Sequence, residues 1–372
     1  MRILLTGGGT GGHITPLVAV ARELKKISKE KGINNLELFY VGPDGMAKGF
    51  LAKEVIVLKT ILAGKMRRYF SFMIFADIFK IFFGLIQAIW HVFWIMPDIC
   101  FGKGGYGSFS AVIACWIFGV PILIHESDSV PGSVNRRLSG LVKRIAISFM
   151  ATEKFFPQEK TALVGNPIRD SICRGQRDRA GQTLGLSGSR APIFIFGGSQ
   201  GAQTINEAVL AILKELSAKY EIIWQTGKKN YENILSEIKR LFGQVPAGCH
   251  IFNFLNEEQV ADAFVVSDLI ISRAGSANIF EIAACGKPSI IIPLPTAASD
   301  HQRENALEYA RSGGAEIIEQ QNLTPHIFLA EIDKIMKDNE LRQRMSSGAK
   351  SFAKPEAGRM IAEELLRLAN SQ

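Results

Sequence analysis

The chain has 372 residues, 47% of them hydrophobic, and 43 basic against 35 acidic residues give a net charge of +8. This size accommodates two ordinary cores of about 150 to 190 residues each, and the basic balance suits anionic small molecules, an acidic membrane surface or nucleic acid. Five widely spaced cysteines without a C-x-x-C pair support neither a disulfide framework nor a zinc site and fit a reducing cytosol. Because the first residues already form a strand pattern, we expect no export signal.

Strand and helix patterns alternate along the chain. In the first half we expect strands at 3–5, 36–41, 99–101 and 122–124, with helices at 16–29 and 109–118. In the second half we expect strands at 193–196, 221–225, 249–252, 269–272 and 288–293, with a helix at 204–219. Continuous apolar strands separated by helices predict an α/β fold with parallel sheets covered on both faces. We place two domains at 1–163 and 164–356, and expect 357–372 to form a helix that returns to the first domain.

Two of the apolar strands run into glycine-rich loops that open a helix, at Gly7–Gly12 and Gly197–Gly201. Glycine lacks a Cβ and tolerates positive φ, so bare backbone N–H groups can approach an anion at a helix N-terminus. A third cluster, Gly102–Ser108, again falls between a strand and a helix and contains a lysine and Tyr106. We therefore expect phosphate ligands, with two phosphates or a diphosphate in the first domain.

The first loop also satisfies G-x-G-x-x-G, the pattern of dinucleotide-binding oxidoreductases, at Gly7, Gly9 and Gly12. In so glycine-rich a run the pattern is almost unavoidable, and the acidic residue expected about 20 residues later is missing. His13 follows the loop, just before a helix that we expect to open at Pro16. An imidazole there can accept a hydroxyl proton beside a bound phosphate or sugar, and a helix-capping role is the alternative.

Residues 69–96 depart from this pattern because Phe, Ile and Trp dominate them. Their polar or small residues fall on one narrow stripe of a helix: Asp77, Lys80, Gly84, Gln87 and His91. A transmembrane helix is disfavoured, because Asp or Lys near its centre costs roughly 2.5–3.5 kcal/mol each and a span would interrupt an α/β domain. Two interpretations remain: a helix buried within its domain, or an apolar face lying on the bilayer with Lys65, Arg67 and Arg68 at anionic headgroups.

Further polar residues follow later strands, at the end where parallel sheets carry their sites. Glu126 and Asp128 come after the strand at 122–124. In the second half, the Ser199 hydroxyl can donate to a phosphate oxygen. Glu281, on a helix that we expect Ser276 to cap, can accept hydrogen bonds from the two vicinal hydroxyls of a ribose, with a solvated glutamate as the alternative. The segment 298–306 groups amide, carboxylate and imidazole side chains, which is typical of sites for hydroxyl-rich ligands.

These motifs, in this order and over nearly the whole chain, resemble the MurG family. The motifs are Gly-Gly-Thr-Gly-Gly-His13, Gly-Gly-Tyr-Gly-Ser108, Gly-Asn-Pro-Ile-Arg169, Gly-Gly-Ser-Gln-Gly-Ala202, Arg273-Ala-Gly-Ser276 with Glu281, and Asp300-His-Gln302 with Asn305-Ala306. The resemblance implies a GT-B glycosyltransferase with two Rossmann-like, doubly wound domains facing across a cleft. It implies that GlcNAc moves from UDP-GlcNAc to lipid I, the lipid-linked MurNAc-pentapeptide, giving lipid II for peptidoglycan. It also implies a peripheral protein on the cytoplasmic side of the bacterial cell membrane.

Carried over position by position, the resemblance implies contacts with UDP-GlcNAc at Thr10, Gly11, Gly12, Arg169, Ser199, Leu255, Ser276, Ala277, Asn278, Glu281 and Gln302. We expect the acceptor diphosphate at Gly104, Gly105 and Tyr106. One position departs from the family, which has an asparagine where this chain has Asp128. An ionised aspartate accepts but does not donate hydrogen bonds, so this difference bears on the selectivity for the sugar and not on the reaction class.

The implied reaction is an inverting displacement in which the muramyl 4-hydroxyl attacks the anomeric carbon and UDP leaves. His13 is the candidate base and Glu126 its competitor, while helix N-termini and Ser199 stabilise the departing diphosphate. Without an Asp-x-Asp motif we expect no metal and no cofactor, and we expect no nucleic-acid partner. A UDP-GlcNAc 2-epimerase-like isomerase and a noncatalytic sugar-nucleotide-binding protein remain alternatives, with a dehydrogenase a distant third.

Overall fold

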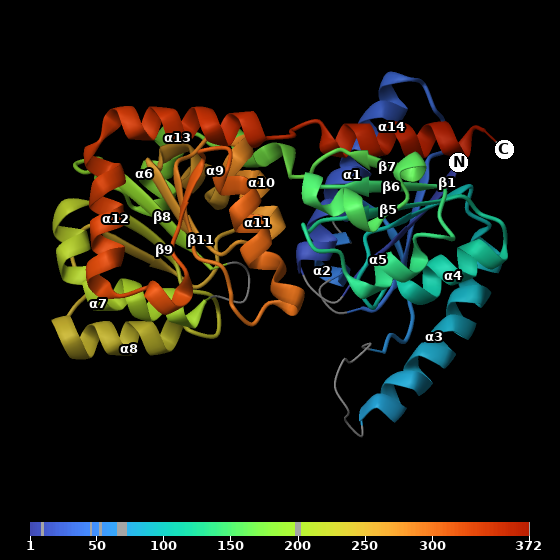
Figure 1. Ribbon diagram of the computed structural model, residues 1–372, viewed down its shortest axis with the longest axis horizontal. Helices are drawn as coiled ribbons and strands as arrows, with labels where there is room; N and C mark the ends of the chain where they lie inside the picture. Colours follow the sequence, from blue (N-terminus) through green and yellow to red (C-terminus); the bar gives the residue numbers. More distant parts are fainter. Residues whose placement is uncertain (9–10, 45–46, 52–53, 65–72, 198–201, 372) are drawn as a thin grey trace. The chain divides into compact units, whose positions relative to one another are not determined.

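The computed structural model describes residues 1–8, 11–44, 47–51, 54–64, 73–197 and 202–371 (Figure 1). The chain divides into two compact units, residues 1–169 with 354–372, and 170–353. These bounds lie a few residues from the domain limits expected from the sequence. Each unit has one parallel β-sheet with helices on both faces, which confirms the predicted α/β class.

The sheet of unit 1 has seven parallel strands in the order β3-β2-β1-β4-β5-β6-β7. The strands are β1 (Arg2–Thr6), β2 (Glu37–Gly42), β3 (Val57–Thr60), β4 (Ile99–Gly102), β5 (Ile122–Glu126), β6 (Arg144–Ile147) and β7 (Thr161–Leu163). The central strands β4 and β5 are buried at every residue, because helices cover both of their faces. All seven strands are parallel, so their carboxyl ends meet along one edge of the sheet.

Alternate side chains of β1 belong to two separate cores of unit 1. Ile3 and Leu5 pack in a cluster with residues of α1 (Gly11–Glu30) and α14 (Ala357–Ala369). Leu4 packs on the opposite face with residues of α3 (Met73–Ile95), α4 (Phe109–Ile117) and α5 (Ser133–Leu138). Figure 1 shows α14 lying beside α1, so the last segment of the chain completes the first unit. The short helix α2 (Ala47–Leu51) contacts α1.

The sheet of unit 2 has six parallel strands in the order β10-β9-β8-β11-β12-β13. They are β8 (Pro192–Phe196), β9 (Glu221–Gln225), β10 (Cys249–Phe252), β11 (Leu269–Ser272), β12 (Ser289–Ile291) and β13 (Ala315–Ile317). Its helices are α6 (Arg177–Leu184), α7 (Gln203–Lys219), α8 (Tyr231–Phe242), α9 (Glu257–Val266), α10 (Ser276–Ala284), α11 (His301–Ala310), α12 (Pro325–Lys337) and α13 (Asn339–Phe352). Ile193 and Ile195 of β8 face the core under α7, α8 and α12, whereas Phe194 packs edge-to-face on Phe264 of α9.

Two helix starts differ from those expected. Helix α1 begins at Gly11 instead of Pro16, so His13 lies inside its first turn and Pro16 within the helix. The N-cap of α10 is Gly275 in an extended conformation, one residue before the expected Ser276. Ser276 was expected to be the N-cap because serine is preferred at that position. It is instead the first residue of the helix, and Gly275 is the N-cap.

Candidate active site

Two glycine loops meet at the carboxyl edge of the sheet in unit 1. Gly105 has φ of +76°, and a Cβ on it would lie 2.8 Å from the carbonyl oxygen of Gly8 and 3.1 Å from Nε2 of His13. A side chain at this position would therefore collide with the first loop, and the left-handed backbone favours glycine as well. The contact places the predicted base His13 beside Gly104, Gly105 and Tyr106, the residues expected to hold the acceptor diphosphate.

His13 is half-buried in the first turn of α1. The N-terminal end of a helix carries partial positive charge and unpaired backbone N–H groups, so this turn favours an anionic ligand. Tyr40 fixes the approach to the loop, because its hydroxyl donates a 2.7 Å hydrogen bond to the carbonyl oxygen of Gly7. Gly11 and Gly12 open the same helix, whereas Thr10 lies outside the described residues.

Glu126 ends β5 and is buried, 5% exposed. Its carboxylate accepts hydrogen bonds from the backbone N–H groups of Asp128 at 3.2 Å and Gly132 at 3.0 Å, and from Nδ2 of Asn135 at 3.0 Å. Burial and the neighbouring charge of Asp128 raise the pKa of Glu126, while Lys103 and these hydrogen bonds oppose the shift. The side chain therefore organises the whole loop from Asp128 to Asn135.

Lys103 was not predicted as a site residue, although it lies in the third glycine cluster. It is only 1% exposed, and its ammonium group donates a hydrogen bond to the hydroxyl of Ser127. Burial lowers the pKa of Lys103 to about 8, while the charges of Glu126 and Asp128 work in the opposite direction. A buried cation thus faces two carboxylates directly before the Gly104–Gly105 turn.

Asn135 was also missed. Its Nδ2 donates to Glu126 and, at 3.1 Å, to the carbonyl oxygen of His125. Its Oδ1 is buried without a hydrogen-bond partner among the residues the structure describes, and it would lie 2.8 Å from a Cβ on Gly104. A buried acceptor of this kind has free capacity for a donor group, so it marks the Gly104 turn as a place for a hydroxyl or amide.

His125 has a structural position. It is fully buried, and its Nε2 lies 2.9 Å from the carbonyl oxygen of Gly165 and 3.1 Å from the hydroxyl of Ser148. Burial and the charge of Lys103 hold the pKa of His125 well below its usual range. The neutral imidazole therefore donates to Gly165 and joins β5 to the segment after β7.

In unit 2, several residues that were predicted to contact UDP-GlcNAc lie on α10, which follows β11. Ser276, Ala277 and Asn278 form the first turn of α10, and Nδ2 of Asn278 donates a 2.9 Å hydrogen bond to the hydroxyl of Ser272. Glu281 lies on the second turn and is only 4% exposed, which argues against the alternative of a solvated surface glutamate. The hydrogen bond from Asn278 to Ser272 joins the first turn of α10 to the carboxyl end of β11.

The remaining predicted residues are dispersed. Oε1 of Gln302, in the first turn of α11, accepts a 3.1 Å hydrogen bond from the backbone N–H of Leu294. Leu255 is buried, and its backbone N–H donates to Oε1 of Gln225 at 2.9 Å. Arg169 is the last residue of the first stretch of unit 1, and Ser199 lies outside the described residues.

Two consecutive residues before α11 adopt the left-handed conformation without being glycine. Ser299 has φ of +55° and Asp300 has φ of +56°. Such conformations cost of order 1–3 kcal/mol each and concentrate at functional sites. The strain therefore supports a ligand-binding role for the turn that leads into Gln302, a signal that the sequence did not carry.

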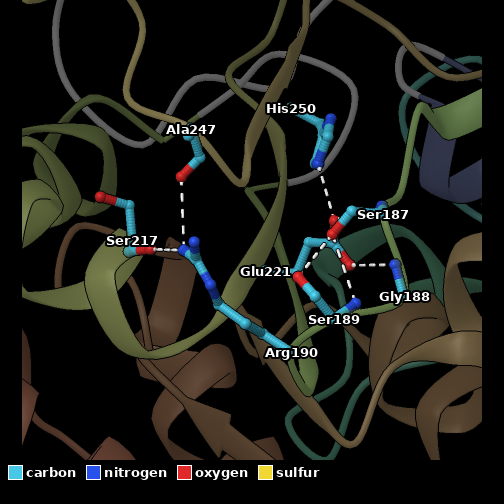
Figure 2. Close-up of polar contacts among 8 residues, drawn as sticks. All are labelled: Ser187, Gly188, Ser189, Arg190, Ser217, Glu221, Ala247 and His250. Atoms are coloured by element: carbon cyan, nitrogen blue, oxygen red, sulfur yellow. Dashed lines mark hydrogen bonds and ion pairs between the residues drawn. The ribbon is translucent and has the colours of Figure 1, made fainter.

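A second polar cluster lies at the amino end of β9 in unit 2 (Figure 2). Glu221, 1% exposed, accepts hydrogen bonds from the backbone N–H groups of Ser187 at 2.6 Å and Gly188 at 3.2 Å, and lies 3.3 Å from Nε2 of His250. Arg190 donates to the carbonyl oxygens of Ser217 and Ala247. None of the predicted site residues belongs to this cluster, which ties the loop before β8 to the sheet.

Helix α3 carries a continuous apolar surface, which we call the apolar α3 face. It is formed by side chains 50–65% exposed: Ile78, Phe79, Phe82, Phe83, Ile86, Trp90, Phe93 and Trp94. Gly84 and Gln87 of the predicted polar stripe instead face the preceding segment: a Cβ on Gly84 would lie 1.9 Å from the carbonyl oxygen of Leu62, whose N–H donates to Gln87 at 2.8 Å. Figure 1 shows α3 extending beyond the rest of unit 1.

Length and hydropathy would allow Asp77–Ile95 to cross a membrane, although 22% of this window is buried inside the protein. Large apolar side chains face outward along α3, whereas Asp77, Gly84, Ala88, Val92 and Ile95 face the protein. Lys80 of the predicted polar stripe is exposed. The interpretation as a helix wholly buried in its domain is therefore wrong. Lys65, Arg67 and Arg68, expected to accompany this face, lie outside the described residues.

Comparison with known proteins gives matches over both units. The family model "Glycosyltransferase family 28 N-terminal domain" matches residues 3–147, and "Glycosyltransferase family 28 C-terminal domain" matches residues 192–360. A protein of Bacillus cytotoxicus is 33% identical over 370 residues, 99% of each chain, and is named UDP-N-acetylglucosamine--N-acetylmuramyl-(pentapeptide) pyrophosphoryl-undecaprenol N-acetylglucosamine transferase. A Bacillus thuringiensis protein with the same transferase name is 35% identical over 91% of this chain and 92% of its own.

Solved structures show the same architecture. The crystal structure of Acinetobacter baumannii MurG aligns with a TM-score of 0.74 and 26% identity, covering 98% of this chain and 99% of that one. The UDP-GlcNAc 2-epimerase of Neisseria meningitidis aligns with a TM-score of 0.70 over 99% of this chain and all of its own, but at 16% identity. The epimerase likeness therefore shows a shared fold alone.

Proposed function

Because this chain belongs to the MurG family of glycosyltransferases, we propose that it transfers GlcNAc from UDP-GlcNAc to lipid I, giving lipid II for peptidoglycan. The observation that carries this function is the full-length identity to transferases of that name, at 33% over 99% of both chains. Two convergent glycine loops beside a half-buried histidine in unit 1 suit the diphosphate and the attacking hydroxyl of such an acceptor.

We assign the base to His13 and a positioning role to Glu126. The carboxylate of Glu126 is buried and already accepts three hydrogen bonds from its own loop, whereas the imidazole of His13 borders the Gly105 turn. In the proposed step the acceptor hydroxyl oxygen forms a bond to the anomeric carbon while its proton moves to Nε2 of His13. The bond from that carbon to the diphosphate oxygen breaks, and UDP leaves with the electron pair.

The donor is assigned to unit 2. The N-terminus of α10 offers backbone N–H groups to the diphosphate, and the buried carboxylate of Glu281 offers two acceptor oxygens to the ribose hydroxyls. Stabilising the charge that develops on departing UDP is the largest contribution we expect from the protein. Thr10 and Ser199, which complete the predicted donor set, lie outside the described residues.

A test of the reaction measures UDP release by the purified protein from UDP-GlcNAc, with and without a short-chain lipid I analogue. Release that requires the analogue, together with a disaccharide product, is the expected result. Release without acceptor would replace the transferase with an epimerase or hydrolase. UDP-GlcNAc binding without release in either arm would leave a sugar-nucleotide-binding protein.

The apolar α3 face is assigned to the membrane surface. Its eight large side chains are half-exposed or more, and the proposed acceptor is anchored in a bilayer by its polyprenyl chain. We expect the variant Phe79→Ser/Phe82→Ser/Trp90→Ser to lose binding to phosphatidylglycerol vesicles. The matched variant Leu241→Ser/Val245→Ser/Ile327→Ser removes exposed apolar residues of unit 2 and should retain it. Equal vesicle binding by both variants would remove the membrane role of α3.

A further inference from the structure

Two cysteines of unit 2 face each other beside α10. Cys173 is the last residue of the 3-10 turn Asp170–Cys173, and Cys285 is the C-cap of α10. Their Sγ atoms are 2.9 Å apart. The structure describes all five cysteines of the chain, and each carries a free thiol. Neither Cys173 nor Cys285 has a part in the proposed transfer reaction.

Both cysteines are held in place by contacts with α9. After Cys173, the backbone N–H of Gln176 donates to Oδ1 of Asp262 at 2.8 Å, and the guanidinium of Arg179 bonds both oxygens of the same carboxylate at 2.7 and 2.9 Å. After Cys285, Nζ of Lys287 donates to the carbonyl oxygens of Val265 and Ser267, at the end of α9. Because α9 holds both segments, the packing of unit 2 keeps the two sulfur atoms close together.

The two thiols have different reactivity. Cys173 is exposed, and its hydrogen bond with the Cys285 thiol lowers the pKa of Cys173, whereas partial desolvation of its sulfur and the charges of Glu281 and Asp170 act in the opposite direction. The same contact, together with burial, raises the pKa of Cys285. A solvent-accessible thiol with a lowered pKa next to a second thiol is an arrangement in which oxidation proceeds to a disulfide.

We infer that Cys173 and Cys285 form a reversible disulfide when the protein meets a hydroperoxide. The Cys173 thiolate attacks one peroxide oxygen, the O–O bond breaks, and a sulfenic acid forms as hydroxide leaves. The sulfur of Cys285 then attacks the sulfenic sulfur, the S–O bond breaks, and the thiol proton and hydroxide leave as water. Two thiols and one hydrogen peroxide thus give one disulfide and two waters, and a dithiol reductant reverses the change. The sulfur atoms need to approach by less than about 1 Å, since a disulfide bond is about 2.05 Å long.

The disulfide would act on the donor side of the proposed reaction, and this part of the inference rests on the proposed function. It would join the turn directly after Arg169 to the end of α10, the helix that carries Asn278 and Glu281. The Glu281 carboxylate already lies close enough to influence the pKa of both cysteines. A covalent link at the end of α10 therefore restrains the helix that is assigned to the ribose and diphosphate, and we expect oxidation to lower donor turnover.

The other cysteines provide an internal contrast. Cys100 and Cys115 also lie near each other, but both are buried in unit 1, and burial together with Cys100 raises the pKa of Cys115. Burial raises the pKa of Cys249 to about 12. Buried thiols of this kind react slowly, so peroxide should modify the Cys173–Cys285 pair selectively.

The experiment treats the full-length protein with hydrogen peroxide and counts thiols after denaturation. We expect the count to fall from five to three, and the peptides containing Cys173 and Cys285 to appear joined, with the mass of two hydrogens lost and restored by dithiothreitol. Cys173→Ser should keep all its thiols. Cys285→Ser should instead accumulate a sulfenic acid that dimedone labels at Cys173. Five remaining thiols in oxidised wild-type protein, or dimedone labelling at another cysteine, would overturn the inference.

Turnover is measured on the same samples with UDP-GlcNAc and the lipid I analogue. Oxidised wild-type protein should lose turnover severalfold and regain it with dithiothreitol, while Cys173→Ser should be unaffected by peroxide. A disulfide that forms without changing turnover would overturn the link to the donor site. Absence of turnover in the reduced protein would instead refute the proposed function, because the thiol count does not depend on it.

Discussion

Glu126 in unit 1 and Glu221 in unit 2 are both buried carboxylates at the end of a parallel strand, and both accept hydrogen bonds from backbone N–H groups. Their pKa values shift in opposite directions. Burial and Asp128 raise the pKa of Glu126. For Glu221, burial acts in the same sense, but hydrogen bonds from Ser187, Gly188 and His250 outweigh it and lower the pKa.

The difference follows the direction of the strands. Glu126 stands at the carboxyl end of β5, where parallel sheets carry their sites, and shares its surroundings with Asp128 and the buried Lys103. Glu221 stands at the amino end of β9, where the backbone N–H groups of Ser187 and Gly188 and the imidazole of His250 face it. The two neighbouring carboxylates Glu126 and Asp128 at the carboxyl end of β5 indicate a functional site. The hydrogen-bonded carboxylate of Glu221 at the amino end of β9 indicates a structural role.

The largest effect on kcat/KM is expected from replacing His13, near the carboxyl end of the unit 1 sheet, and a small one from replacing His250, beside Glu221. His13→Ala should lower kcat/KM for lipid I analogue by roughly 10²–10⁴-fold, the usual contribution of a general base. His250→Ala, which removes the imidazole beside Glu221, should leave kcat/KM within a few-fold of wild type. The check is steady-state UDP release with both variants. Equal losses of kcat/KM in the two variants would contradict the catalytic role of His13 and the purely structural role of His250.

The glutamates themselves should separate activity from stability. Glu126→Gln should lower kcat about 10²-fold by displacing the loop that it organises, with a small change in thermal stability. Glu221→Gln should keep kcat and lower the free energy of unfolding by about 1–3 kcal/mol, because its donors lose a charged acceptor. Turnover and denaturant unfolding measured on both variants decide the matter. The reverse result would make Glu126 the structural carboxylate.

The third prediction concerns Lys103 and the dependence of kcat/KM on pH. Since its pKa is about 8, the wild-type kcat/KM should fall as the pH rises past about 8 and the buried positive charge disappears. Lys103→Met should be less active at neutral pH and lack this alkaline decline, whereas Lys103→Arg should retain activity to higher pH. An unchanged alkaline decline in Lys103→Met would show that another group causes it.

The sequence predicted most strands of both sheets, including the edge strand β10, but not their contacts, and it missed the interior strand β6 and the edge strands β3, β7 and β13. Strands such as β4 and β8 are continuous apolar runs and were placed within a residue, because helices bury both faces. The edge strands β3 and β7 are short, consist of exposed and half-buried residues, and carry no such run. The approach of Gly105 to His13 depends on the register of β4 beside β1, which no local pattern encodes. The burial of Lys103 has the same origin.

The smallest effect concerns the pH dependence of stability, and its sign differs between the two glutamates. The lowered pKa of Glu221 means that the unfolded chain binds more protons below about pH 4.5, so this residue stabilises the fold above that pH and the contribution is lost as the pH falls through the folded pKa. The raised pKa of Glu126 means that the folded state holds its proton longer, so stability declines as the pH rises from about 4.5 through the folded pKa. On acidification, Glu221→Gln should therefore become less destabilised relative to wild type, whereas Glu126→Gln should become more destabilised relative to wild type. Melting temperatures between pH 3.5 and 7 test this, and parallel trends in the two variants would contradict the opposite shifts on which the comparison rests.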